Sequence, residues 1–354
     1  MRGDDELRLV LAGASSGVDP GRLARRYGCA ALLRASPGVL ERMGALPALI
    51  DALRIARGAD TDTYRTSLAE RGVACLTRSD DGFPARLGQL HDPPLAVFVA
   101  GPRTDALAWP HPVASVVGSR QATEPGLMLA RRLAAGVAES GGLVVSGLAL
   151  GVDAAAHDGA LSAGGVTVAV LGCGVDVAYP RTNRRLYGRI RESGLLLSEY
   201  PPGTPPAPWR FPARNRLIAA LGDATVVVEA RAGSGALITA DHALDLGRDV
   251  LAVPGTAGLS STAGANGLLK AGAGLIETAD DLCGWLGLPP PPSARQPPSD
   301  GERGVLAALC DRPATADDLS TALRLSASVV TATLVRLELA GRAARGADGL
   351  WRAG

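Results

Sequence analysis

The stretch that decides the fold is VASVVGSRQATEPGLMLARRLAAGVAESGGLVVSG, residues 113–147. It opens at 113–118 on an apolar run typical of a buried strand, and it closes on a second such run at 142–147. Residues 126–141, between the two runs, have the apolar spacing of an amphipathic helix. A strand, a helix and a strand in this order predict a right-handed crossover between two parallel strands.

Further apolar runs continue this alternation along the chain. A second amphipathic helix is predicted at 234–247. The further predicted strands are 72–77, 166–172, 194–199, 224–230 and 249–255. Buried strands that alternate with helices of this length predict an α/β fold with a doubly wound parallel sheet.

Polar and glycine-rich clusters follow the predicted strands. A doubly wound sheet binds its ligand outside the carboxyl ends of its strands. We therefore expect these clusters to meet at one edge of the sheet. They are Gly118-Ser119-Arg120, Ser146-Gly147, Gly172-Cys173-Gly174, Ser198-Glu199, Glu229 and Pro254-Gly255.

The sequence on either side of the sheet region predicts two smaller domains. Before it, apolar residues at helical spacing are separated by Pro and Gly, which predicts a compact module of four or five helices. After it, PPPPSARQPPSD at 289–300 predicts an extended linker, and three helical patterns followed by a hairpin pattern predict a winged helix. The predicted domain boundaries are 1–71, 72–287, 288–300 and 301–354.

Composition narrows the class of protein. The five cysteines are scattered, without a CxxC or a histidine at ligand spacing, which predicts reduced core thiols and neither a disulfide framework nor a metal site. The first residues, MRGDDELRLVLAG, lack a sustained apolar run, and no segment is long and apolar enough to span a membrane. We therefore expect a cytoplasmic protein.

Cations gather in one stretch, residues 179–216. It contains eight arginines and two glutamates, a net charge of +6 in a chain that nets +1. Five aromatic residues lie in the same stretch, so flat rings alternate with guanidinium groups. Cations that follow phosphates and rings that stack on bases are what a single-stranded nucleic acid site needs, although a solvated helix followed by a proline loop has the same composition.

The motifs at the strand ends suggest how an anion would be held. Gly118, Ser119 and Arg120 come between a strand and a helix, where backbone N–H groups and a hydroxyl can hold a phosphate. Ser146-Gly147 resembles a second group of backbone donors, but close packing of a helix on the sheet explains these small residues equally well. Asn215 can bond a phosphate, orient the neighbouring chain or cap a helix.

Seven runs in the sheet region resemble, in order, motifs of the DprA/Smf family of bacterial DNA-processing proteins. They are SGLALGVDAAAH (146–157), VLGCGVDVAYP (170–180), LSEYPPG (197–203), FPARNRLIAAL (211–221), VVVEARAGSGALITA (226–240), VPG (253–255) and AGANGLLKAGA (263–273).

The resemblance implies three domains: a helical SAM-like domain, an extended Rossmann-like core and a C-terminal winged helix. It implies a protein, without a cofactor, that binds single-stranded DNA, protects incoming DNA and loads the RecA recombinase during natural transformation. It further implies a homodimer formed through the core, with single-strand-binding protein as a further partner. The residues that it places at the DNA are Gly118, Ser119, Arg120, Ser146, Gly147, Arg181, Phe211, Arg214, Asn215, Arg216 and Lys270.

The alternative is a Rossmann-like nucleotide-processing enzyme of the phosphoribohydrolase type. Glu229, Ser234-Gly235 and Thr239 lie where such enzymes keep a glycine-rich loop and an acid, with Asp153, His157 and Asp176 as conceivable partners. However, no spacing brings a nucleophile, a base and an orienting group together, and His157 in mid-helix is more simply a core residue. Because Val177 replaces the third glycine, Gly172-x-Gly174 does not form a dinucleotide fingerprint. We therefore expect a binding protein and not an enzyme.

The predicted recognition helix of the winged helix, SASVVTATLVRLELAG, carries Arg336 as its one cation. Sequence-specific reading of duplex DNA needs several polar side chains in the major groove, so we do not expect it here.

Overall fold

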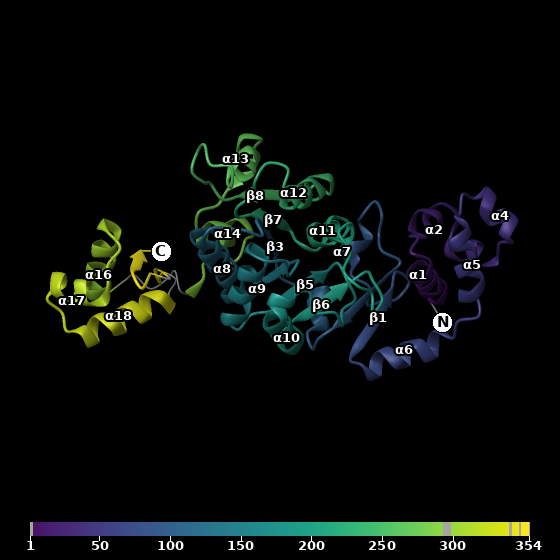
Figure 1. Cartoon of the computed structure of the whole chain (residues 1–354), viewed down its shortest axis with the longest axis horizontal. Helices are drawn as coiled ribbons and strands as arrows, with labels where there is room; N and C mark the ends of the chain where they lie inside the picture. The colour runs from purple at the N-terminus through teal and green to yellow at the C-terminus, as the bar shows by residue number, and fades with distance from the viewer. Residues whose placement is uncertain (1–2, 293–298, 340–341, 347, 354) are drawn as a thin grey trace.

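The computed structural model of the chain describes residues 3–292, 299–339, 342–346 and 348–353. Figure 1 shows the main sheet at the centre of the molecule, N-terminal helices at one end and C-terminal helices at the other. Residues 293–298, in the middle of the predicted linker, lie outside the described residues.

The N-terminal segment is helical, as its apolar spacing predicts. Pro and Gly interrupt that spacing and keep most of the helices short. Within residues 3–71 the helices number six, one more than the upper prediction: α1 (Asp4–Ser16), α2 (Gly21–Tyr27), α3 (Cys29–Arg34), α4 (Pro37–Arg42), α5 (Pro47–Ala56) and α6 (Thr61–Glu70). Leu7 of α1 and Leu68 of α6 are buried in one apolar cluster with Cys75 and Phe98 of the sheet, so this segment packs directly on the core.

The main sheet has nine strands in the described chain. They are β1 (Val73–Thr77), β2 (Ala96–Ala100), β3 (Val113–Val117), β4 (Leu143–Ser146), β5 (Thr167–Leu171), β6 (Leu195–Ser198), β7 (Ala224–Val227), β8 (Asp249–Ala252) and β9 (Gly274–Leu275). Their order across the sheet is β1-β2-β6-β5-β4-β3-β7-β8-β9.

The predicted α/β fold is confirmed. The seven neighbouring strands β6-β5-β4-β3-β7-β8-β9 all pair in parallel, as predicted. The prediction is incomplete at the other edge. There β2, which the sequence analysis missed, pairs antiparallel with both β1 and β6. No helix of crossover length separates β1 from β2, because only the four-residue α7 (Ala85–Gly88) lies between them, and an antiparallel pair needs none.

Helices cover both faces of the sheet. On one face lie α8 (Glu124–Glu139), α9 (Val152–Ser162), α10 (Arg184–Ser193) and α14 (Ala279–Trp285). On the other lie α11 (Arg210–Leu221), α12 (Gly235–Asp245) and α13 (Ala263–Lys270). Their buried residues are mostly Ala, Val and Leu, so the helices approach the sheet closely.

The C-terminal segment folds as predicted. It contains α16 (Asp300–Asp311), α17 (Ala316–Leu323), α18 (Ala327–Leu339) and the antiparallel pair β10 (Ala343–Arg345) and β11 (Trp351–Ala353). These elements have a core of their own, which includes Val305, Leu334 and Trp351. The winged-helix prediction is confirmed.

The cysteines correct one prediction. All five thiols are free, and Cys75, Cys173 and Cys283 are buried as expected. However, Cys310 is exposed and Cys29 is only partly buried, so these two are not core thiols.

Candidate nucleic-acid interface

The loops that follow β3, β4 and β7 meet at the carboxyl edge of the sheet, as predicted. The backbone N–H of Ser119 donates to the carbonyl of Glu229 at 2.6 Å, and the N–H of Val152 donates to the carbonyl of Ser119 at 3.2 Å. The close approach of residues 151–152 to Ser119 requires glycine at 151, because φ there is +79° and a Cβ atom would overlap the Ser119 carbonyl.

These loops and the start of α11 enclose an open hollow of about 810 Å³. Its charged lining residues are Arg120, Arg214, Arg231 and Asp153, a net charge of +2. Gly118, Ser119 and Asn215 also line it, so the predicted Gly118-Ser119-Arg120 loop does lie at the hollow. A concave, positively charged site of this kind attracts phosphate groups.

Three side chains form a layered stack at the hollow. The Tyr179 and Phe211 rings stack with centroids 5.4 Å apart and an interplanar angle of 24°. On Phe211 lies the guanidinium of Arg120, whose Cζ is 5.5 Å from the ring centroid. Arg120 is exposed and Tyr179 is 41% exposed, so flat faces and a cation are open to solvent together. Tyr179 was not among the predicted site residues, although the aromatic content of the 179–216 stretch pointed to it.

Arg214 is buried, although it lines the hollow. It was expected to contact DNA, but its side chain lies inside the protein, 3% exposed. Its guanidinium donates to the carbonyl of Gly147 at 2.7 Å and to that of Val170. Burial lowers the pKa of Arg214 to about 10, and the negative charge of Asp153 opposes that shift. These two hydrogen bonds therefore connect the ends of β4 and β5.

Ser146 and Gly147, which were expected to be phosphate donors or packing residues, have partners within the protein. Both are buried, and the hydroxyl of Ser146 donates to the carbonyl of Val116 at 2.6 Å. The N–H of Gly147 already donates to the Asp153 carboxylate, at 3.2 Å. Because these groups are bonded within the protein, they are not a free donor group for a phosphate.

The remaining residues of α11 also bond within the protein. Arg216 donates to Asp92 at 3.0 Å and to Glu199 at 2.7 Å, and its side chain is only 11% exposed. Burial alone would lower the pKa of Arg216, but Glu199 and Asp92 outweigh that effect and raise it. Arg216 therefore departs from its predicted role at the DNA, since its charge is already paired. Asn215 lies within α11 rather than at its cap, and its amide donates to the carbonyl of Gly235 at 3.1 Å.

Two predicted cations lie outside the hollow. Arg181 is exposed in the short 3-10 turn η2 (Arg181–Asn183). The Asn183 amide fixes this turn by donating to the carbonyls of Leu148 and Ala149, at 3.1 and 3.2 Å. Because Ala149 lines the hollow, Arg181 lies on a turn attached to its rim. Lys270 is exposed at the end of α13 and does not line the hollow.

Sequence reasoning missed Gln121 and Arg231, which both line the hollow. Gln121 directly follows the predicted Gly118-Ser119-Arg120 cluster. Arg231 comes two residues after Glu229, and its place just beyond a strand end was the signal that could have identified it.

The residues considered for catalysis have internal partners. His157 is fully buried, and its Nδ1 is 2.7 Å from the Thr167 hydroxyl, which confirms it as a core residue. Asp176 pairs with Arg71 at 2.6 Å and accepts the N–H of Gly203. Glu229 is buried and accepts the N–H and the hydroxyl of Thr123, both at 3.0 Å.

Among the residues that the structure describes, no cluster of three or more His, Cys, Asp or Glu side chains is placed to hold a metal ion. Among the same residues, no helix is long and apolar enough to cross a membrane.

The family models and the relatives that match this chain all belong to one family of DNA-processing proteins. Residues 74–287 match the family model for DNA recombination-mediator protein A, and residues 289–349 match the DprA winged-helix domain. A relative from Mycobacterium tuberculosis strain H37Rv that carries the DprA name is 43% identical over 306 residues, 80% of this chain and 78% of that one. The DNA processing protein DprA of Streptococcus pneumoniae is 42% identical over 205 residues, 57% of this chain and 71% of its own.

Two solved structures are similar as well. The X-ray structure of DNA processing protein A from S. pneumoniae superposes with a TM-score of 0.67 at 30% identity, over 81% of this chain and 98% of that one. DNA processing protein A from Helicobacter pylori superposes with a TM-score of 0.55 at 30% identity, over 60% of this chain and 95% of that one. The H. pylori structure was described for its single-stranded DNA binding mode.

Proposed function

Because this chain belongs to the DprA family of DNA recombination-mediator proteins, we propose that it binds single-stranded DNA in the hollow at the carboxyl edge of the sheet. The observation that carries the proposal is the stack of Arg120, Phe211 and Tyr179, in which Arg120 and Tyr179 are exposed, beside a positively charged concave surface. Unpaired bases stack on such rings, whereas a duplex keeps its bases stacked on one another.

Exposed arginines and backbone loops both contribute to DNA binding at this site. Arg120 and Arg231 at the hollow and Arg181 at its rim are exposed, so each can meet a phosphate without breaking a bond of the fold. Gly118 and Ser119 bring backbone close to the same surface. Phosphate contacts carry no sequence information, so we expect binding that depends strongly on salt and weakly on sequence.

In this proposal Arg214, Arg216, Ser146 and Gly147 do not contact the DNA, and they hold the loops that surround the bound DNA strand. Lys270 contributes only if a long strand continues beyond the hollow to α13. The winged helix is not the main DNA surface, because Arg336 of α18 already bonds Glu302 at 3.2 Å.

The wider role that we propose follows from the family. The chain protects incoming single-stranded DNA and loads RecA on it during natural transformation, and it acts in the cytoplasm as a homodimer joined through the core. Single-strand-binding protein is a further partner, because it covers the DNA that RecA must reach. We propose no catalytic activity, since Asp153, His157 and Asp176 serve the fold.

Titration of a fluorescent single strand tests the DNA site. Arg120→Ala and Phe211→Leu should each weaken binding to the strand. The loading role has a separate assay: addition of the protein should shorten the lag before RecA hydrolyses ATP on a strand coated with single-strand-binding protein. Unchanged DNA affinity in both variants would reject the site, and an unchanged lag would reject the loading role.

A further inference from the structure

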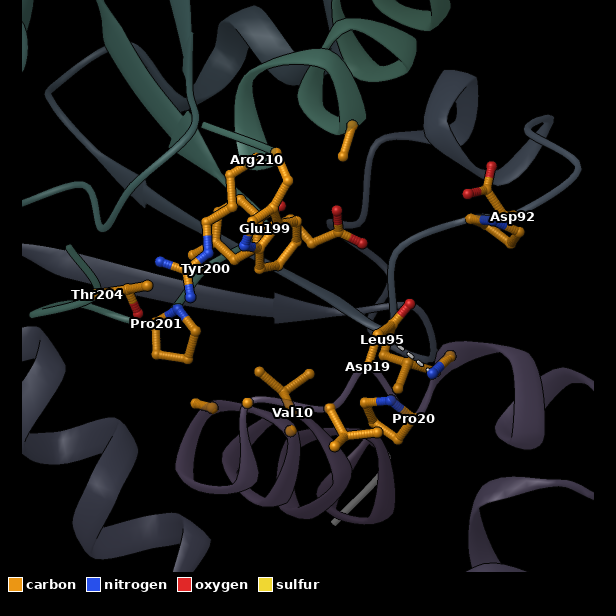
Figure 2. Close-up of a pocket in the computed structure, with 18 of the residues that line it drawn as sticks. Val10, Asp19, Pro20, Asp92, Leu95, Glu199, Tyr200, Pro201, Thr204 and Arg210 are labelled. Carbon is orange, nitrogen blue, oxygen red and sulfur yellow. Dashed lines mark hydrogen bonds between the residues drawn. The ribbon is translucent and has the colours of Figure 1, made fainter. Parts of the chain in front are cut away.

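A second cavity lies between the N-terminal helices and the core. It encloses about 330 Å³ and is separate from the hollow at the strand ends. Figure 2 shows Tyr200 and Arg210 of the core on one side, with Val10 of α1 and Pro20 of the following turn on the other. A cavity of this volume is at the lower limit of small-molecule sites.

One wall of this pocket consists of flat groups. The rings of Tyr200 and Trp209 meet edge to face with centroids 6.2 Å apart. The guanidinium of Arg210 lies over both rings, with its Cζ 4.9 Å from each centroid. Trp209 lines the pocket and is 57% exposed, so part of its aromatic surface is open to a ligand. A wall of this kind favours a planar, polarisable ligand.

The lining charges exclude a highly charged ligand. The cations of the pocket are Arg25, Arg210 and Arg216, and its anions are Asp19, Asp92 and Glu199, so its formal charge is zero with His242 neutral. Polyphosphates prefer the hollow, whose lining carries +2. One oxygen of Asp19 accepts the N–H of Gly21, and one oxygen of Glu199 accepts a bond from Arg216. A carboxylate accepts several bonds, so both retain capacity for N–H donors of a ligand.

The pocket and the hollow share a wall. In the segment 208–211, Pro208 and Phe211 line the hollow, whereas Trp209 and Arg210 between them line the pocket. Pro208 and Trp209 directly precede α11, Arg210 and Phe211 are its first two residues, and the same helix carries Arg214 and Arg216. A ligand in the pocket would therefore contact the same short segment that holds the Phe211 stack.

We propose that this pocket binds a single nucleobase that carries an exocyclic amino group, with its plane against Trp209 and Arg210 and its amino edge toward the carboxylates of Glu199 and Asp19. The base comes either from the bound strand or from a free nucleotide. Only the strand-borne source rests on the proposed function. Adenine, guanine and cytosine have the amino donor, and thymine lacks it.

The experiment uses the full chain and two variants of the pocket. Ala14→Phe fills the cavity from α1, and Trp209→Ala removes the stacking face while altering a largely exposed residue. Ser15→Phe is the matched control, because Ser15 is exposed on the same helix outside the pocket lining. Arg120→Ala serves as the control for the hollow. Thermal melting identifies any variant that fails to fold. If Ala14→Phe does not fold, Trp209→Ala alone tests the pocket.

The first arm probes a free nucleoside, which has the base of a nucleotide without its phosphate. Saturation-transfer NMR with deoxyadenosine should show contact to the base protons in the parent, in Ser15→Phe and in Arg120→Ala, with a weaker signal for thymidine. Ala14→Phe should abolish the contact, and Trp209→Ala should weaken affinity about tenfold, as expected for one lost stacking contact.

The second arm probes the strand. A single strand with one 2-aminopurine should lose fluorescence on binding to the parent and lose less on binding to the pocket variants, while anisotropy shows similar strand affinity. A response in either arm supports the pocket and identifies the source of the base. If the pocket variants behave like Ser15→Phe in both arms, the proposed base site is wrong. In that case, strand binding that still depends on Arg120 would leave the proposed function intact. Conversely, deoxyadenosine binding without any strand binding would reject the function and keep the pocket.

Discussion

Replacement of Arg214 by methionine distinguishes a structural arginine from a DNA contact. Methionine keeps much of the side-chain volume and removes the charge and all donors. The carbonyls of Gly147 and Val170 would lose the bonds that Arg214 donates. Asp153, which is also buried, would lose the positive charge that opposes the rise of its pKa on burial.

The expected cost follows from these contacts. Removal of one member of a buried, charge-compensated group typically destabilises a protein by about 3–5 kcal/mol, because it leaves the opposite charge uncompensated. Asp153→Asn alone should also destabilise, since the N–H groups of Gly147 and Ala149 would lose a carboxylate acceptor. The double variant should cost less than the sum of the two single changes, because it leaves no lone buried charge.

Chemical denaturation measures these free energies of unfolding, and strand titration under folding conditions measures DNA affinity. Arg231→Met is the matched control, because Arg231 lines the same hollow but is exposed. It should reduce DNA affinity without a change in stability. A loss of stability below about 1 kcal/mol in Arg214→Met, together with a DNA affinity reduced at least as much as in Arg231→Met, would refute the structural role.

Three further outcomes are expected. Burial, together with the charge of Arg214, lowers the pKa of His157 to about 3, so below its usual value of about 6.5 the unfolded chain binds a proton that the folded chain does not. From neutral pH to about pH 5 this group should therefore cost about 2 kcal/mol of stability, and denaturation at both pH values should show that His157→Gln lacks this component. Arg120→Ala and Arg181→Ala should each weaken strand binding with unchanged melting temperature, whereas a drop in melting temperature would mean that the arginine supports the fold. A chain that ends at Pro292 should fold and keep most of its strand affinity, and a loss above about 3 kcal/mol in titration would place the DNA site in the winged helix.

The sequence predicted the fold well where the local pattern and the tertiary structure agree. The run 113–147 gave its strand, helix and strand because buried parallel strands need continuous apolar residues and the crossover needs a helix. It did not predict β2 at 96–100, because this apolar run has no long helix on either side, and antiparallel pairing depends on a partner far away in the chain.

The sequence predicted part of the hollow but not the surroundings of each arginine. Gly118, Ser119 and Arg120 do line the hollow, because strand ends of a parallel sheet share an edge. Glu199 and Arg216 line the second cavity instead, and Arg181 and Lys270 line neither. However, Arg120 and Arg214 look alike in sequence, whereas one is exposed on a ring and the other is buried under carbonyl groups. Burial of an arginine depends on loops such as 147–153 that pack against it, and a single sequence does not show that packing.

The central claim, that the hollow binds single-stranded DNA, is tested most directly by one salt titration of a labelled strand and its matched duplex against the parent and Phe211→Ala. If about four phosphates are neutralised at roughly −0.7 each, log K for the strand should fall against log salt with a slope near −3. The duplex should bind more weakly than the strand, and Phe211→Ala should lose about tenfold in strand affinity, the effect of one stacking contact, with an unchanged slope. Equal or tighter binding of the duplex, a flat salt response, or full strand affinity in Phe211→Ala would contradict the account.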